Sequence, residues 1–401
     1  MINGCLATAH NRALAGTRRI EKIRKEVNMN ACLTPKSTVV GVDVHKYSHT
    51  AVAMDCFGQE KARLDFSNER LNDYVLWLRE LGDKEDIIVA LEDVNGYGFH
   101  IVERLSKEKI SMRYVPAILT ERERKKSIHR EKSDYEDAKR VGKVILTKFD
   151  ETLPAKESIA DDQERELSAN LDLLTAERRI LVQEKTILKN QLHAMLHQIY
   201  GDHYGEGFPK VFHKKAIKSF RQKLTQTKFD NPIRVALAGS SIRRFDRLAL
   251  VEKQLKEIDG SINNIGQKSE AVLALSDNIH GCGIITAASI IAEVTTISRF
   301  CDKSRFARYS GIAPIDKSSG RHQRLYTSPF GNRKMNRALH TIALCQIACK
   351  GDDRGKIYFK KKLSEGKTKL WALRCLKRQI SNKVFQALKE QKRRERTIQN
   401  G

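Results

Sequence analysis

The sequence lacks the features of a membrane-spanning, secreted or zinc-binding protein. No apolar run approaches the roughly 20 residues that a membrane-spanning helix needs. Residues 1–28 carry basic side chains among short apolar pieces, without the apolar core of a secretory signal. The eight cysteines form no CxxC pair and no zinc-ligand spacing. We therefore expect a reduced, cytoplasmic protein, in which Cys345 and Cys349 are small core residues of one helix.

Acidic residues are scarce beside basic ones. The 401 residues include 74 Lys and Arg against 49 Asp and Glu, which gives a net charge of +25 and a pI of about 9.7. A charge of this sign and size favours a polyanionic partner, and the phosphate backbone of a nucleic acid is the usual one. A membrane surface is the weaker alternative. The length is sufficient for two or three domains.

A strand with a carboxylate in it opens the patterned part of the chain. Residues 39–46 read Val-Val-Gly-Val-Asp-Val-His-Lys, and this β-branched run predicts a short buried strand. Asp43 is costly to bury there without a partner or a metal ion. It is either a structural residue held by hydrogen bonds or the first catalytic aspartate of a site of the RNase H kind.

Strands and helices alternate after this strand, which indicates an α/β domain. We expect strands over residues 61–66, 87–92 and 113–116, and helices around 71–81 and 101–105. The second of these strands ends on a carboxylate, Glu92. Ser133 can cap a further helix, in which Asp134 and Asp137 share one face because they are three residues apart.

We expect these four carboxylates to meet at one edge of the sheet. A helix packed across the strand ends would bring Asp134 and Asp137 near Asp43 and Glu92. No arginine is expected close by, so two Mg²⁺ ions about 4 Å apart would satisfy the acids and support displacement at a phosphodiester. The alternative is that Asp134 and Asp137 are ordinary acids that complement a helix dipole.

The middle of the chain carries two heptad patterns. Apolar residues repeat over 167–199, with Arg178 and Lys185 at two of the core positions, and a second pattern covers 248–265. These patterns predict either a helical hairpin or a dimerising coiled coil. They concern architecture rather than chemistry.

Two loops of the C-terminal part suit contacts with nucleic acid. Gly281 and Gly283 lie between two predicted helices, which fits either a phosphate-holding helix-hairpin-helix or a plain interhelical turn. Ser319 lies at a loop tip among basic residues and is either a nucleophile for a phosphate or an ordinary polar residue. The basic residues that we expect to contact phosphates are Lys46, Lys317, Arg321, Arg324, Arg333, Lys334 and Arg337.

In this order, the motifs resemble those of the DEDD-type transposases and site-specific recombinases of the insertion-sequence "one-ten" family, with the Piv-type DNA invertases. The resemblance covers roughly residues 38–350. It rests on the strand that contains Asp43, on the acids that follow it, and on the C-terminal motifs at 280–283, 311–314, 319–320 and 331–333.

The resemblance implies an RuvC-like domain in which Asp43, Glu92, Asp134 and Asp137 bind Mg²⁺. It also implies that Ser319 attacks DNA and forms a phosphoserine link during strand exchange. The implied partners are DNA, namely the element ends and the target, and a structured guide RNA from the element's own non-coding end. A homo-oligomer is implied as well, either a dimer through the coiled coil or a tetramer.

Three positions depart from the family pattern. Asp93 stands where many relatives carry an uncharged residue, so it could assist or replace Glu92. His280 replaces the usual proline before the glycine that follows it. Ser318 precedes Ser319 and leaves the identity of the nucleophile open by one position.

We expect five regions along the chain. They are a basic extension over 1–37 that starts at Met1 or Met29, an α/β RuvC/RNase H-like domain over 38–153, a helical coiled-coil region over 154–270, a mainly α transposase domain with the helix-hairpin-helix and the serine loop over 271–350, and a basic tail helix over 351–401. The expected function is a DNA transposase or recombinase. The alternatives are a metal-dependent nuclease or Holliday-junction resolvase in which the acids cut, and an inactive DNA- or RNA-binding protein.

Overall fold

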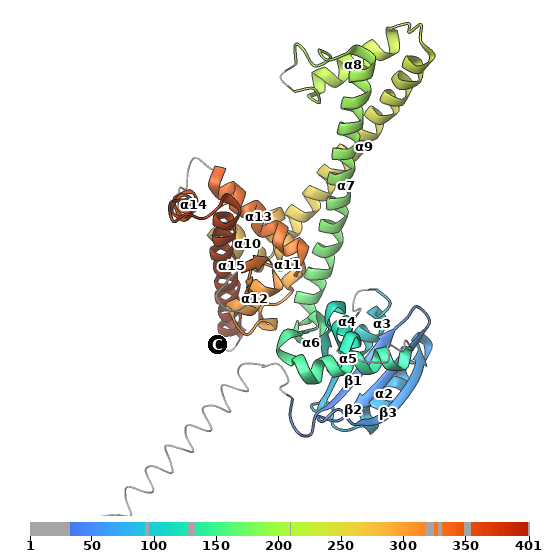
Figure 1. Cartoon of the computed structure of the whole chain (residues 1–401), viewed down its shortest axis with the longest axis vertical. Coiled ribbons are helices and arrows are strands. Elements are labelled where there is room, and N and C mark those ends of the chain that lie inside the picture. Colours follow the sequence, from blue (N-terminus) through green and yellow to red (C-terminus); the bar gives the residue numbers. More distant parts are fainter. Residues whose placement is uncertain are drawn as a thin grey trace, which may run out of the picture. The chain divides into compact units, whose positions relative to one another are not determined.

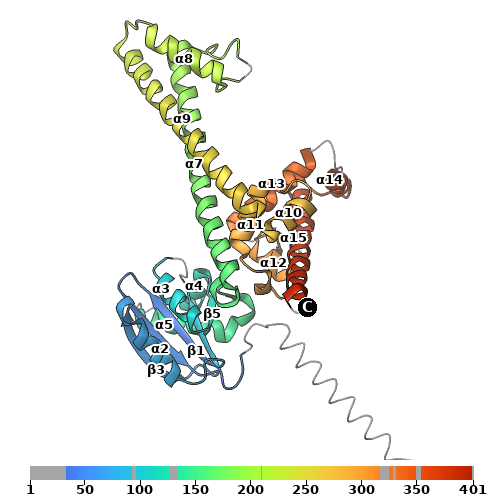
Figure 2. The same cartoon turned by 180° about the vertical axis from the view of Figure 1, so that it is seen from behind.

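The computed structural model describes residues 33–92, 96–126, 133–208, 210–316, 325–327, 331–348 and 354–399. Contacts within the chain divide it into two compact units, drawn in Figures 1 and 2. The first unit comprises Met1–Glu166 and Val294–Tyr309, and the second comprises Leu167–Glu293 and Ser310–Gly401. Within the described ranges, no helix has the length and apolar character needed to cross a membrane.

The first unit contains a six-stranded mixed sheet. Its strands are β1 (Thr38–Val44), β2 (Ser48–Met54), β3 (Glu60–Ser67), β4 (Ile87–Leu91), β5 (Ser111–Tyr114) and β6 (Leu153–Pro154). Their order across the sheet is β3-β2-β1-β4-β5-β6. β1 pairs antiparallel with β2 and parallel with β4, and β4 pairs parallel with β5. The predicted alternation of strands and helices is therefore confirmed.

Helices cover both faces of this sheet. The helices of the first unit are η1 (Asn68–Arg70), α2 (Leu71–Glu80), α3 (Phe99–Lys107), α4 (Ala117–Lys126), α5 (Asp134–Lys148), η2 (Phe149–Glu151), α6 (Lys156–Ile159), η3 (Ile297–Arg299) and α12 (Lys303–Tyr309). α2 and α3 pack on the face that carries Val40 and Val42 of β1. α4 and α5 pack on the face that carries Val39. Because strand residues alternate between the two faces, the odd-numbered residues of β1 point toward α5.

A glycine lets α5 cross β1 at backbone contact. A Cβ atom added to Gly41 would lie 2.0 Å from the carbonyl oxygen of Ala138 and 2.5 Å from the backbone nitrogen of Gly142. A Cβ atom on Gly142 would lie 2.2 Å from the end of the Met54 side chain. The first turn of α5 is therefore held close to the carboxyl end of β1.

A segment from far along the chain belongs to the first unit. The guanidinium of Arg299, which is buried, donates a hydrogen bond to the carbonyl oxygen of Pro154 at 3.2 Å. Arg305 pairs with Asp150 at 2.7 Å. Val294–Tyr309 thereby joins the end of the sheet domain, although about 130 residues of the second unit separate the two in sequence.

The second unit is mostly helical. Its elements are α7 (Asp162–Tyr200, whose first residues belong to the first unit), α8 (Lys214–Gln226), α9 (Pro232–Gln267), α10 (Glu270–Asn278), α11 (Ile284–Val294, whose last residue belongs to the first unit), β7 (Pro314–Asp316), β8 (Leu325–Thr327), α13 (Arg333–Ala348), α14 (Arg354–Ser364) and α15 (Lys369–Gln399).

α7 and α9 run antiparallel and side by side, as both Figure 1 and Figure 2 show. Arg178 of α7 pairs with Asp259 of α9 at 2.5 Å, and Lys185 pairs with Glu252 at 2.8 Å. The two basic residues at core positions of the heptad pattern therefore have acidic partners on the returning helix. These contacts support the predicted helical hairpin, and dimerisation through it stays a prediction.

One packing prediction was wrong. Cys345 is exposed, although its Cβ lies beside Gly281 in the turn between α10 and α11. Cys349 lies outside the described residues. The predicted boundaries of the five regions stay a prediction.

Candidate active site

Two of the predicted acids lie at the ends of neighbouring strands. Val42 of β1 is paired in parallel with Leu91 of β4, and Asp43 and Glu92 come directly after these two residues. Alternation along the strands directs both carboxylates to the face that α5 covers. This arrangement agrees with the prediction from the sequence.

The other two predicted acids lie in the first turn of α5. The hydroxyl of Ser133 accepts a hydrogen bond from the backbone N–H of Glu136 at 3.2 Å, so the predicted cap is confirmed. The helix then begins with Asp134 and carries Asp137 one turn later. The close crossing of α5 over β1 brings this turn to the edge where the strand acids lie.

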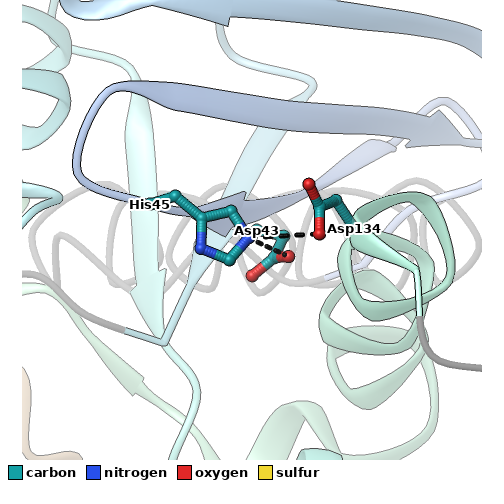
Figure 3. Close-up of side chains that lie close together, drawn as sticks. All are labelled: Asp43, His45 and Asp134. Atoms are coloured by element: carbon teal, nitrogen blue, oxygen red, sulfur yellow. Dashed lines mark ion pairs between the residues drawn. The ribbon is translucent and has the colours of Figure 1, made fainter.

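One histidine, His45, is close to two of these carboxylates (Figure 3). Nε2 of His45 is 3.1 Å from Oδ2 of Asp43 and 3.3 Å from Oδ1 of Asp134. One ligand atom from each of the three residues lies within 4.8 Å of the other two. A single cation is small enough to be shared by three atoms so arranged.

The electrostatics of the strand acids also point to a cation. Burial raises the pKa of Asp43; His45 opposes the rise, and the like charges of Asp137 and Asp134 add to it. Burial likewise raises the pKa of Glu92, and the negative charges of Asp43 and Asp137 add to this rise. Partly buried carboxylates that repel one another fit a divalent cation, because carboxylate oxygens are the ligands that Mg²⁺ prefers.

The expectation that no arginine lies near the acids was wrong. Arg140, which is buried, lies 2.7 Å from Oδ1 of Asp137 and 3.8 Å from Glu136. It follows Asp137 by three residues on the same helix, so the two side chains share a face. Asp137 is therefore partly neutralised by the protein, and its role as a metal ligand stays a prediction.

Sequence reasoning assigned no role to His45 or Arg140, although the spacing offered a signal for each. His45 follows Asp43 by two residues, which places both on the same side of an extended chain. Arg140 follows Asp137 by one helical turn. The Asp93 alternative to Glu92 lies outside the described residues.

The predicted nucleophile also lies outside the described residues, as do its alternative and three neighbouring cations. These residues are Ser319, Ser318, Lys317, Arg321 and Arg324. Downstream of them, Arg333 and Arg337 are exposed and lie four residues apart on one face of α13. Lys46, after β1, is exposed too.

Lys334 differs from its basic neighbours because its charge is used inside the second unit. Its Nζ lies 2.6 Å from Asp172 and 2.8 Å from the buried Glu293. Burial alone would lower the pKa of Lys334, but hydrogen bonds to Asp172 and Glu293 outweigh it and raise that pKa. This pairing disfavours the predicted phosphate contact of Lys334, which nevertheless stays a prediction.

The two predicted phosphate-binding glycines differ in their surroundings. They lie in the turn between α10 and α11, and Gly281 has a φ of 80°. A Cβ atom on Gly281 would lie 2.9 Å from Cβ of Cys345, so this glycine serves the packing of the turn against α13. Gly283 has open space around it. Both the helix-hairpin-helix and its phosphate contacts stay predictions.

Two transposase families match the chain. A DEDD-type transposase family of IS110 elements matches residues 40–201, which include all four predicted acids. The transposases of the IS116/IS110/IS902 family match residues 274–358. The mixed sheet with helices on both faces fits an RNase H-like domain within the first match.

Two curated proteins are similar to the chain. The uncharacterized 44.8 kDa protein of insertion element IS116 from Streptomyces clavuligerus is 23% identical over 392 residues, which cover 88% of this chain and 95% of that protein. The uncharacterized 43.6 kDa protein of insertion element IS110 from Streptomyces coelicolor is 29% identical over 145 residues, which cover 36% of this chain and 35% of that protein. Transposases are enzymes that cut and transfer DNA. The chain belongs to the IS116/IS110/IS902 family of transposases.

Proposed function

We propose that this transposase cuts and rejoins DNA with Ser319 as its nucleophile, assisted by two Mg²⁺ ions at Asp43, Glu92, Asp134 and Asp137. A structured RNA encoded by the element guides the protein to its donor and target DNA. One observation carries the proposal: acids from β1, β4 and α5 meet at one edge of the sheet, and burial raises the pKa of the two strand acids.

The proposed chemistry is a transfer of a DNA phosphate to the serine and back to DNA. When bound at the acids, Mg²⁺ would align the phosphate and stabilise the charge that develops on its oxygens. Oγ of Ser319 loses its proton to a neighbouring base and forms a bond to phosphorus. One P–O bond of the DNA backbone breaks, and the departing oxygen takes up a proton. A second DNA hydroxyl then attacks the phosphoserine, which restores the serine.

The charge of the chain supports a nucleic-acid partner for this reaction. The net charge is +25, and Arg333 and Arg337 present two exposed guanidinium groups on one side of α13. Guanidinium groups bind phosphates through paired hydrogen bonds. Charge of this kind serves DNA and RNA alike, because both present phosphates.

A second copy of the chain is also part of the proposal. α7 exposes three large aliphatic side chains at heptad spacing, on a side away from its contact with α9. They are Leu173, Ile180 and Ile187, with 70%, 59% and 55% of their surface exposed. A stripe of this kind on a long helix is typical of a surface that packs against another helix.

A covalent protein–DNA link would distinguish this mechanism from its rivals. The full chain would be incubated with Mg²⁺, element-end DNA and the flanking non-coding RNA, and adducts would be separated on a denaturing gel. We expect an adduct with the wild type and with Ser318→Ala, and none with Ser319→Ala. Asp43→Asn should also abolish it, whereas Asp73→Asn, an exposed change on α2, should leave it intact.

Three other outcomes would contradict the proposal. Metal-dependent cutting without an adduct would indicate a nuclease in which the acids cut. An adduct lost with Ser318→Ala alone would assign the nucleophile to Ser318. Tight binding of DNA without any strand breakage would indicate a binding protein.

A further inference from the structure

We propose that His45 is itself a ligand of the cation at the acid cluster, through Nε2 of its ring. The inference rests on the function proposed above, because it concerns the same cation. It adds a nitrogen to a site that the sequence presents as a set of carboxylates.

The geometry around the ring carries this inference (Figure 3). Nε2 lies at nearly the same distance from Asp43 and from Asp134, 3.1 and 3.3 Å. A single N–H group points in one direction and satisfies one acceptor well. A cation placed among the three atoms uses both carboxylates and the ring nitrogen together, and their mutual separations of at most 4.8 Å allow this.

An ion pair alone would contribute little to the stability of the folded protein in this position. The side chain of His45 is 49% exposed, and that of Asp134 is 61% exposed. Pairs between such exposed groups contribute only about 0–1 kcal/mol. His49, four residues later, shows what a structural histidine looks like in this domain: it is buried, and its Nε2 lies 3.0 Å from Oδ1 of Asn68.

A nitrogen ligand has a consequence for the choice of metal. Mg²⁺ binds almost entirely through oxygen, whereas Mn²⁺, which also favours oxygen ligands, accepts a histidine nitrogen more readily. Loss of the His45 ring should therefore weaken Mn²⁺ binding more than Mg²⁺ binding. This difference separates a ligand from a residue that merely holds the carboxylates in place.

The test uses Mn²⁺ as a probe of the full-length protein with no histidine tag. Electron spin-echo envelope modulation would detect ¹⁴N coupled to bound Mn²⁺, and calorimetry would give the dissociation constants for Mn²⁺ and Mg²⁺. Because the chain has 12 histidines, the coupling is assigned by difference between variants. His100→Gln is the matched control, since His100 is exposed on α3, which covers the other face of the sheet.

We expect ¹⁴N coupling in the wild type and in His100→Gln, and none in His45→Gln. The Mn²⁺ dissociation constant should rise about tenfold in His45→Gln, and the Mg²⁺ constant by less than about threefold. Bound Mn²⁺ without nitrogen coupling in the wild type, or coupling that survives in His45→Gln, would overturn the inference and leave the acid cluster intact. A wild type that binds no Mn²⁺ at all would instead overturn the proposed metal site and this inference with it.

Discussion

The surroundings of the Asp43 carboxyl group disfavour its ionised form unless a cation is bound nearby. Burial and the charges of Asp137 and Asp134 raise its pKa, and His45 offsets only part of that effect. An ionised group in such a place lowers the stability of the folded state. Sites that serve chemistry often cost stability in this way.

Replacement of this one charge should therefore stabilise the protein when no metal is present. Asp43→Asn is expected to raise the free energy of unfolding by about 1 kcal/mol in the presence of a chelator. Addition of Mg²⁺ should stabilise the wild type and not the variant, because a ligand stabilises only a state that binds it. Urea unfolding with EDTA and with Mg²⁺ would measure both effects. An Asp43→Asn protein that is less stable than the wild type in EDTA would contradict this account.

The raised pKa of Asp43 also predicts a dependence of stability on pH. Protonated Asp43 is favoured in the folded state, so its contribution is fully present below its unfolded pKa of about 3.9 and is lost as the pH rises through the folded value. In EDTA, the difference in melting temperature between Asp43→Asn and the wild type should grow from pH 4 to pH 7. Thermal melts at several pH values would test this, and a constant difference would count against it.

At the scale of single residues, the sequence predicted the acids better than it predicted their partners. A carboxylate in an apolar strand is conspicuous, because burial of an unpaired charge is costly. The 3.3 Å distance between His45 and Asp134 arises only when β1 and α5 are packed together, whereas the 2.7 Å contact between Arg140 and Asp137 is made within α5. Spacing along the chain could suggest these contacts but could not decide them.

At the scale of elements, the geometry of the candidate active site depends on how closely α5 crosses β1. Gly41 makes this crossing possible, because any side chain there would collide with the backbone of the helix. The sequence predicted both elements. It did not predict their separation, since a glycine in a strand has several explanations.

Gly41→Ala is expected to destabilise the first unit by about 3 kcal/mol, because its Cβ would meet backbone atoms that cannot move independently. The same change should weaken Mn²⁺ binding, since the first turn of α5 would be pushed away from Asp43. Gly260→Ala in α9 is the control: no atom lies within 4 Å of its added Cβ, and alanine favours a helix. Equal effects of the two changes on stability would contradict the proposed role of the crossing.

The hairpin of α7 and α9 shows that a heptad pattern does not by itself identify the helix with which it pairs. The pattern alone allowed pairing within a chain or between chains. The acids opposite Arg178 and Lys185 support pairing within the chain, because each basic residue at a core position meets a partner on α9. This complementarity spans about 80 residues of sequence and becomes visible only once the antiparallel register is known.

The exposed stripe of α7 is the surface that we propose for a second copy, and a charge placed in it should disrupt self-association. Ile180→Lys is expected to shift the protein toward the monomer in sedimentation experiments, because a buried lysine in a helix interface carries a desolvation cost. Thr186→Lys is the matched control, since Thr186 is exposed on a different side of α7. A wild type that is monomeric at all concentrations tested would remove the dimer from the proposal.

At the scale of the whole molecule, the excess of positive charge is expected to dominate affinity for nucleic acid. Its contribution is not uniform, because some cations are already paired inside the protein. Arg333 and Arg337 are exposed on α13, whereas Lys334 between them is bound to Asp172 and Glu293. Neighbouring basic residues of one helix are therefore expected to have different roles: Arg333 and Arg337 in binding nucleic acid, and Lys334 in stabilising the second unit.

The salt dependence of DNA binding should distinguish these two roles. Arg333→Ala and Arg337→Ala are each expected to reduce the slope of log affinity for DNA against log salt by about 1, as loss of one phosphate contact would. Lys334→Met should leave the slope unchanged and lower the free energy of unfolding by about 3 kcal/mol, because it leaves the buried Glu293 without its cation. Filter binding at several salt concentrations and urea unfolding would test both. A reduced slope with Lys334→Met would mean that Lys334 does contact phosphate.

The composition of the first unit also has a consequence for synthesis of the protein on the ribosome. Arg299 and Arg305 contact Pro154 and Asp150, yet residues 167–293 must be made before they emerge. At about 5–20 residues per second, the sheet domain waits roughly 6 to 25 seconds for its last segment. During that interval, Asp150 and Pro154 lack their contacts with Arg305 and Arg299. The first unit is therefore complete only after residues 167–293 of the helical unit have been translated.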